Sequence, residues 1–292
     1  MISPHFIRTM VMSMLLTVAF GSLCSCIRED TGNCIQYSVR TRLVDRNGKL
    51  LPDSIATQSV AYIFRNGKYV YSVPVSSDGT YHVFFNGCDN TCMTVFGNRN
   101  ISGFELSKLS VGDDMNTIAV KIASLEQAQD SLLHSRLYYG NVTLSNITPD
   151  SADYPVTLPM YDNLSRLHVI LNNVESLLGT GKYSVKISGL YSEFTYGGIV
   201  TGDSRECNLE MTHLADGSFR SGVVSTLPSD TPLTITLYKD GEAIRTVNTD
   251  YAGNPITTSG GEEKAIVINA GATYTNTQVM PWGDFVSQQA QL

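Results

Sequence analysis

The sequence predicts an all-β protein built from two tandem antiparallel β-sandwich domains. Asn-Gly and Asp-Gly dipeptides recur along the chain, and such pairs readily adopt the positive φ angles that tight hairpin turns require. The segments between them alternate apolar and polar residues or are rich in β-branched residues, which is typical of strands. The composition agrees, because 15 tyrosines and 24 glycines accompany only 16% charged residues.

Composition and charge exclude several classes of protein. The chain has 292 residues, of which 42% are hydrophobic, so there is enough apolar material to bury a core and disorder is excluded. The 20 Lys and Arg residues face 27 Asp and Glu residues, for a net charge of -7. This balance argues against a nucleic-acid partner, because phosphate binding requires a basic face. The composition also excludes a polytopic membrane protein and a coiled coil.

Two predicted hairpins look like one element used twice. The first covers residues 59–74 around Asn66-Gly67, and the second covers residues 233–247 around Asp240-Gly241. One such hairpin in each half is a modest internal repeat, and it favours two domains of similar construction.

The remaining elements complete the predicted organisation. A short helix is predicted over residues 124–133, with Ser124 as its N-cap. We place the domain boundary near Gly140, so the amino-terminal sandwich covers residues 35–140 and the carboxyl-terminal sandwich covers residues 141–292. Further strands are predicted at residues 35–44, 80–85, 93–96, 117–122, 142–147, 166–171, 183–187, 219–226, 265–268 and 274–280.

Residues 1–25 are predicted to be an export signal. Arg8 supplies the positive charge, and residues 10–20 (MVMSMLLTVAF) form an apolar run that is too short to span a bilayer. The sequence Leu23-Cys24-Ser25-Cys26 that follows resembles the bacterial lipoprotein box. In that interpretation the chain is cut after Ser25 and Cys26 carries acyl chains, which would form an effectively permanent anchor. The alternative is an ordinary secretory signal cleaved near Ser22 or Ser25, with Cys26 left as a disulfide partner.

Residues 26–34 are predicted to be a lipidated tether. The acidic pair Glu29-Asp30 resembles the surface-export signal of Bacteroidetes lipoproteins, which would place the protein on the outer face of the outer membrane. The alternative is that these residues are simply a polar spacer.

The other cysteines predict a disulfide and no metal site. Thiols outside the inner membrane tend to pair, and we expect one bridge from Cys34 to Cys88 or Cys92. Cys207 is expected to stay buried as a small apolar residue. No metal is expected, because Cys88 and Cys92 lack zinc-knuckle spacing and no His cluster completes a site.

No constellation of catalytic residues is recognisable, so we predict neither an enzyme nor a cofactor. The sequence contains no nucleophile elbow, no zinc-protease motif and no phosphate-binding loop. His82 and His168 lie inside strand patterns, where a structural role is expected. The acidic pairs Asp113-Asp114 and Glu262-Glu263 are interpreted as solvated turn residues. A calcium loop at Asp113-Asp114 is the weaker alternative, because the spaced oxygen ligands are missing.

The mature amino terminus, CIREDTGNC at residues 26–34, resembles the opening of the FimB-type fimbrial anchor family of Bacteroidales type V pili. The shared features are the lipidated Cys26, the acidic pair and the second cysteine, Cys34. Looser matches lie at residues 137–140 (LYYG), 166–169 (RLHV) and 281–283 (PWG). The additional Cys88/Cys92 pair departs from the family pattern and leaves the disulfide open.

This resemblance implies two transthyretin-like sandwiches and a role in cell adhesion at the base of a fimbrium (pilus). The lipid-anchored protein would hold the fibre through its shaft subunits and limit fibre length. A first strand, from Ile35, that is tied to the membrane cannot be lost, so such a subunit can end a fibre but cannot propagate it.

The carboxyl-terminal segment 274–292 is a candidate donor strand for the first shaft subunit, because alternate side chains of an added strand fill groove pockets. The alternative is that it is only the last strand followed by a polar tail at residues 287–292. The candidate donor side chains are Tyr274, Val279, Trp282 and Phe285.

A surface lipoprotein that binds glycans is the second functional hypothesis. Tyr191, Phe194 and Tyr196 lie near Gly197-Gly198 and could form an aromatic platform for sugar rings, although aromatic residues on strands more often belong to a core. A third class, an enzyme-related sandwich such as a protease inhibitor, has no supporting feature.

Overall fold

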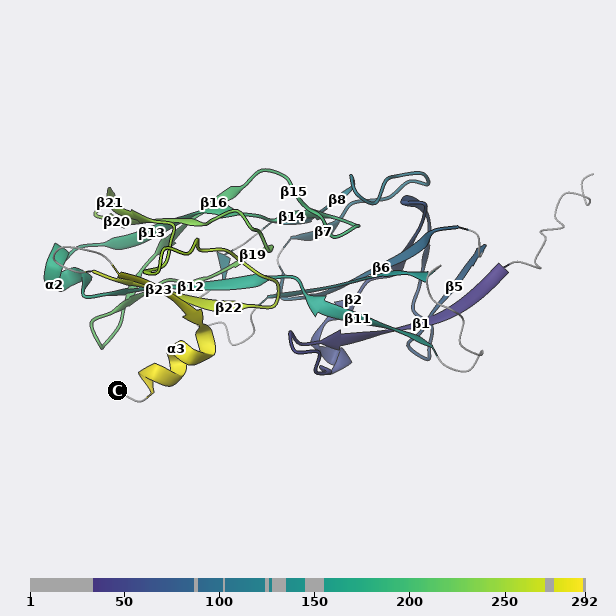
Figure 1. Cartoon of the computed structure of the whole chain (residues 1–292), viewed down its shortest axis with the longest axis horizontal. Helices are drawn as coiled ribbons and strands as arrows, with labels where there is room; N and C mark the ends of the chain where they lie inside the picture. The colour runs from purple at the N-terminus through teal and green to yellow at the C-terminus, as the bar shows by residue number, and fades with distance from the viewer. Residues whose placement is uncertain are drawn as a thin grey trace, which may run out of the picture.

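A computed structural model of the chain (Figure 1) describes residues 34–86, 89–101, 103–123, 126–127, 135–144, 155–270 and 276–290. The fold is all-β, as predicted, and the molecule is elongated. Within the described residues there are four sheets, here called A to D. β1 begins at one end of the long axis, and sheet D and the helices α2 and α3 lie toward the other end.

Sheet A forms the end at which β1 begins. Its strands follow the order β4, β3, β6, β10, β11, β1, β5, and β2 also pairs with β6. The bounds are β1 (Cys34–Val44), β2 (Thr57–Gln58), β3 (Ala61–Arg65), β4 (Lys68–Val73), β5 (Tyr81–Asn86), β6 (Thr91–Arg99), β10 (Arg136–Thr143) and β11 (Val156–Asp162). The single turn η2 (Asp53–Ile55) precedes β2.

Sheet A curls so that its two edge strands approach each other. The Tyr71 hydroxyl on β4 donates a hydrogen bond to the Phe84 carbonyl on β5 at 2.6 Å and accepts one from the Phe84 N–H at 3.2 Å. The curl encloses a core to which β1 contributes every second side chain, as the strand period of two requires. This inner core includes Tyr37, Val39, Leu43, Ile63, Val83, Met93, Val95, Leu158 and Met160.

The remaining sheets carry the rest of the chain. Sheet B contains β7 (Phe104–Leu106), β8 (Ala119–Ile122), β14 (Glu193–Thr195) and β15 (Val200–Thr201). Sheet C contains β9 (Glu126–Gln127), β12 (Ser165–Asn172), β17 (Thr212–His213), β18 (Phe219–Arg220), β19 (Val223–Thr226), β22 (Glu263–Asn269) and β23 (Asn276–Pro281). Sheet D contains β13 (Tyr183–Leu190), β16 (Arg205–Glu210), β20 (Thr234–Lys239) and β21 (Glu242–Val247). The helices are α2 (Val174–Leu178) and α3 (Trp282–Gln289).

Both predicted hairpins are confirmed, and they share their detailed geometry. Asn66 and Gly67 have φ angles of 51° and 77°, and Asp240 and Gly241 have φ angles of 52° and 89°. Positive φ at both central residues is the turn that matches the twist of the flanking strands. In each hairpin, β3–β4 and β20–β21, the register shifts by one residue just before the turn.

The predicted boundary at Gly140 lies inside strand β10. β11 follows Gly140 in the sequence, yet it pairs with β10 and runs parallel to β1, so sheet A continues to Asp162. Gly140 is a packing position instead of a linker, because a Cβ there would lie 2.9 Å from Met160 Cγ and 3.1 Å from Leu158 Cγ.

The two halves also share sheets and a core. Sheet B pairs β8, from before Gly140, with β14, from after it. The main hydrophobic core runs from the outer face of sheet A, through Phe64 and Phe96, to Phe194 and Tyr196 and onward into sheets C and D. β6 is therefore buried on both faces.

The prediction of a helix over residues 124–133 is wrong at the two positions of that segment that the structure describes. Glu126 and Gln127 form β9, which pairs with Val224 and Val223 of β19. The other positions of that segment lie outside the described residues. Pairing with a neighbouring strand outweighed the local helical pattern.

Asp162 joins sheet A to sheet C. Its Oδ2 lies 2.8 Å from Arg166 Nη1 on β12 and 3.0 Å from Arg136 Nη1 on β10. Its Oδ1 accepts hydrogen bonds from the backbone N–H groups of Leu137 and Leu164. The Arg166 side chain is only 1% exposed, and this carboxylate, at 2.8 Å, is the closest one that compensates its charge.

Replacing Asp162 by Ala should destabilise the protein by about 3–5 kcal/mol, because the buried Arg166 charge loses its closest carboxylate. The matched control is Asp53→Ala, which removes the exposed Arg42–Asp53 pair and should cost less than about 1 kcal/mol. Urea unfolding measures both. Equal effects of the two variants would contradict the assigned role of Asp162.

Candidate functional site at the first and last strands

The first described strand is held on both sides. Residues 34–39 of β1 pair with β5, and residues 39–44 pair with β11. A force applied at the start of β1 acts along the strand (Figure 1), so it loads both ladders in shear instead of opening them pair by pair. β1 is therefore a mechanically suitable point of attachment.

The structure separates the two disulfide alternatives. The backbone of Cys34 lies opposite Asn86 at the end of β5. Cys92 is buried on β6, which β10 and β11 separate from β1, and it forms no disulfide; its Sγ lies 3.4 Å from Thr143 Oγ1. Cys88 and Cys26 lie outside the described residues, so the Cys34–Cys88 bridge and the lipidation of Cys26 stay predictions. Cys207 is half-buried and packs against the main core.

The end of the chain is helical instead of extended. Tyr274 lies outside the described residues and Val279 belongs to β23, but Trp282 and Phe285 lie on α3. The polar tail that the alternative placed at residues 287–292 is also helical as far as Gln289. The three-residue spacing of Trp282 and Phe285 places both side chains on one face of the helix.

Two aromatic side chains attach α3 to sheet C. Phe285 is 5% exposed and packs with Ile170, Ala265 and Val267 in a small cluster distinct from the main core. The Trp282 ring stacks on the His168 ring with 3.7 Å between centroids and an interplanar angle of 6°. Most of the other helix residues are exposed, so α3 depends on these two contacts.

A series of polar contacts connects this helix to the junction between sheets A and C. His168 Nε2 lies 2.8 Å from Glu263 Oε1, and Glu263 Oε2 lies 3.8 Å from Arg166 Nε. Arg166 in turn pairs with Asp162. His168 is therefore structural, as predicted.

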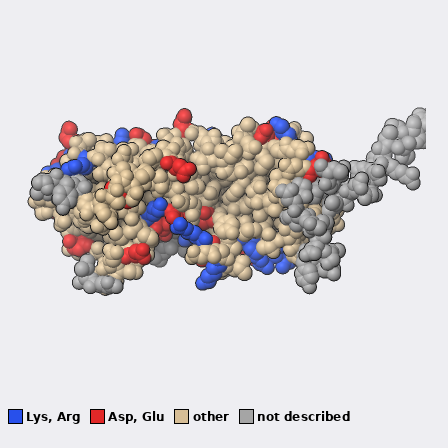
Figure 2. Space-filling model, viewed as in Figure 1, with Lys and Arg blue, Asp and Glu red and all other residues tan. Residues whose placement is uncertain are grey.

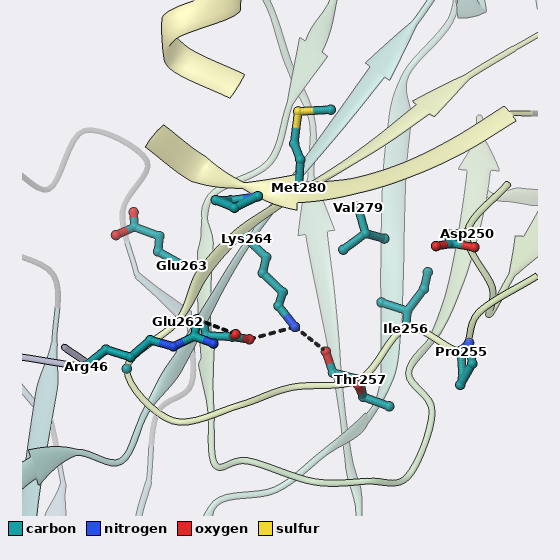
Figure 3. A pocket seen from close by; sticks show the side chains of 12 residues that line it. Arg46, Asp250, Pro255, Ile256, Thr257, Glu262, Glu263, Lys264, Val279 and Met280 are labelled. Atoms are coloured by element: carbon teal, nitrogen blue, oxygen red, sulfur yellow. Dashed lines mark hydrogen bonds and ion pairs between the residues drawn. The ribbon is translucent and has the colours of Figure 1, made fainter. Parts of the chain in front are cut away.

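A slot lies beside β23, between that strand and residues 255–257 (Figure 3). Its volume is about 370 Å³. One edge of β23 pairs with β22 and the other is open. On the open edge, the Thr277 carbonyl already accepts the Tyr251 N–H at 2.7 Å, and Pro281 has no N–H to donate. Two positions of this edge therefore cannot form the full set of hydrogen bonds with an added strand. By alternation, the N–H and C=O of Val279 point toward the same open edge as those of Thr277.

The slot contains an ion-paired carboxylate. Glu262 lies 2.7 Å from Lys264 Nζ and 2.5 Å from Arg46 Nη1, and Lys264 also donates to the Thr257 carbonyl at 3.1 Å. Burial raises the pKa of Glu262, but Lys264 and Arg46 outweigh this effect and hold the pKa below its usual value. The expectation that Glu262-Glu263 is solvated was wrong, because both carboxylates compensate cations at the base of β22.

The other acidic pair supports its turn. Asp114 lies 3.1 Å from Lys68 Nζ and accepts the Asn116 N–H, and Asp113 accepts the Ser110 N–H. Among the described residues there is no group of three or more His, Cys, Asp or Glu side chains that could hold a metal ion.

The aromatic platform predicted for glycans does not form. Phe194 and Tyr196 are fully buried in the main core, where Tyr196 packs edge-on against Phe96. Only Tyr191 reaches the surface, and it is half-buried. Phe194 and Tyr196 are two residues apart, so both side chains point in the same direction, toward Phe96 of sheet A.

Sequence reasoning missed Asp162, Arg166 and Tyr251. Asp162 and Arg166 are four residues apart across a turn between two strands, and no motif marks such a pair. Tyr251 lies in a loop whose contact with β23 is not local.

None of the described helices is long and apolar enough to cross a membrane. On the face shown in Figure 2, acidic and basic side chains are scattered among uncharged ones.

A family model and a solved structure both match this chain to fimbrial anchor proteins. Residues 34–284 match the family of fimbrillin-A-associated anchor proteins Mfa1 and Mfa2. Among solved structures the chain is similar to the fimbrial anchor protein Mfa2 from Porphyromonas gingivalis, with a TM-score of 0.58 and 14% identity over 85% of this chain and 97% of that chain. A search of curated proteins found no match.

Two proteins from Bacteroides thetaiotaomicron have a similar fold. One is a candidate polysaccharide-binding protein, with a TM-score of 0.58 and 14% identity over 85% of this chain and 96% of that chain. The other is a candidate adhesin, with a TM-score of 0.56 and 15% identity over 85% of this chain and 98% of that chain.

Replacing Trp282 by Ala should loosen α3 without unfolding the sheets. Loss of the stack on His168 should lower the local opening free energy by about 2 kcal/mol, which is roughly 30-fold faster amide exchange over residues 283–289. Val286→Ala, at an exposed position of the same helix, is the control and should change little. Unchanged exchange in the Trp282 variant would disprove the attachment of α3 by this stack.

Proposed function

Because the chain belongs to the family of fimbrillin-A-associated anchor proteins, we propose that it is an outer-membrane lipoprotein that holds a fimbria at the cell surface. Cys26 carries the lipid, and shaft subunits of the fibre are the protein partners. The family is one of fibre anchors, which favours a structural role over an enzymatic one.

The inner position of β1 is the observation that carries this proposal. The eight residues 26–33 span at most about 29 Å when fully extended, so the lipid would hold sheet A close to the membrane. Tension from the fibre would pass through β1, which two neighbouring strands hold in shear. A strand that is both enclosed by its sheet and tied to the lipid cannot be exchanged for one from another subunit. The protein would therefore end a fibre and limit its length.

The opposite end of the molecule would contact the fibre. β23 and α3 lie far along the long axis from the start of β1 (Figure 1). We place the donated strand in the segment that begins at Trp282, after it has left the helix. Two features support this release: α3 is attached by a cluster separate from the main core, and Pro281 precedes it without a backbone N–H. Complementation of a shaft subunit by this segment would satisfy an otherwise open sheet edge.

The lipid anchor is tested by Cys26→Ala. The variant should lose palmitate labelling and move from the membrane fraction to the soluble fraction, because the acyl chains provide nearly all of the membrane affinity. Cys207→Ala is the control, and it should keep both the label and the membrane association. Labelled, membrane-bound Cys26→Ala protein would refute the proposal.

The fibre contact is tested by deleting residues 285–292. This variant should co-purify with much less of the shaft subunits, whereas deletion of residues 290–292, which spares Phe285, should leave co-purification nearly unchanged. Thermal melting of both variants checks that the sheets remain folded. Undiminished co-purification of the longer deletion would rule out donation of this segment.

A further inference from the structure

A second hollow lies on the flank of the molecule, where sheets B, C and D come together. It has a volume of about 560 Å³ and is formed by three loops and β15. We propose that this hollow binds a neutral carbohydrate. Its lining consists of Tyr191, Val200, Pro228, Ser229, Asp230, Thr231, Thr258, Ser259 and Gly260.

The chemistry of the lining fits a sugar. Besides Tyr191, four Ser and Thr side chains line the hollow. The hydroxyls of Ser229 and Thr258 already bind the backbone of the loops, whereas Thr231 and Ser259 are exposed. A hydroxyl both donates and accepts, as sugar hydroxyls do. The exposed Asp230 carboxylate can accept two such hydroxyls. The half-buried Tyr191 adds an aromatic ring against which the C–H face of a sugar can pack.

Charge narrows the class of ligand. None of the residues that line the hollow is Lys, Arg or His, so no cation is available to compensate a phosphate, sulfate or carboxylate group. Asp230 would also repel such groups. The expected ligands are therefore uncharged sugars, and sialylated or sulfated glycans are excluded.

The walls of the hollow are fixed before any ligand enters. The Tyr191 N–H donates to Thr226 Oγ1 at 2.8 Å, and its carbonyl accepts the Leu227 N–H at 3.0 Å. Across the hollow, the Ser229 N–H donates to Thr258 Oγ1 at 2.9 Å. Loops held by such bonds lose little conformational freedom on binding, which favours recognition of a small polar ligand.

The size of the hollow is also appropriate. Clefts that bind small molecules enclose roughly 300–1,000 Å³. The slot beside β23 is within this range, but its carboxylate and its ammonium group already compensate each other. The flank hollow instead presents Asp230 and Thr231, both exposed, toward solvent.

The experiment uses the mature chain without its lipid, on an array of neutral, sialylated and sulfated oligosaccharides, followed by calorimetric titration of the best neutral binder. Tyr191→Ala should weaken binding at least tenfold, and Asp230→Asn should weaken it several-fold. Tyr251→Ala, which removes an exposed tyrosine outside the hollow, is the matched control and should bind normally. Thermal melting verifies that each variant is folded.

Binding of neutral sugars that depends on Tyr191 and Asp230 but not on Tyr251 supports the site. A chain that binds no neutral sugar, binds only anionic glycans, or binds equally well without the Tyr191 ring would overturn it. The readout is independent of fibre assembly, so failure here leaves the anchor proposal intact.

Discussion

A single buried carboxylate, Asp162, determines how the two ends of this molecule are connected. It ends β11 in sheet A, and it compensates Arg166 on β12, a central strand of sheet C. Because Arg166 is buried, an independent movement of the two sheets would leave its charge with only the more distant Glu263 carboxylate, at a cost of several kcal/mol. The main core runs across the same junction. The elongated molecule is therefore suited to transmit force along its length.

The direction of that force explains why the position of β1 matters. A strand at the edge of a sheet can be peeled away one hydrogen bond at a time, whereas the first half of β1 pairs with β5 and its second half pairs with β11 on the opposite side. Pulling on its first residue stresses several bonds together. The proposed roles of β1 in attachment and in termination of the fibre both rest on this pairing.

At the far end, β23 has a partly blocked edge, and the helix α3 that follows it packs on a small cluster. Tyr251 and Pro281 restrict β23, which protects an otherwise exposed strand from unspecific pairing. α3 is attached through Trp282 and Phe285, and His168 and Glu263 connect that contact back to Arg166. Displacement of α3 would thus disrupt a small cluster and not the main core.

Local sequence determined the all-β class, both Asn-Gly and Asp-Gly hairpins and the alternating strands, because turn dihedrals and side-chain periodicity depend on neighbouring residues alone. The tertiary structure decided what depends on distant partners. β11 joined sheet A because Leu158 and Met160 fit its inner core, and Gly140 became a packing position for the same reason. Residues 282–289 form a helix because this conformation packs the side chains of Trp282 and Phe285 on sheet C. Long-range pairing and burial select among the conformations that local sequence permits.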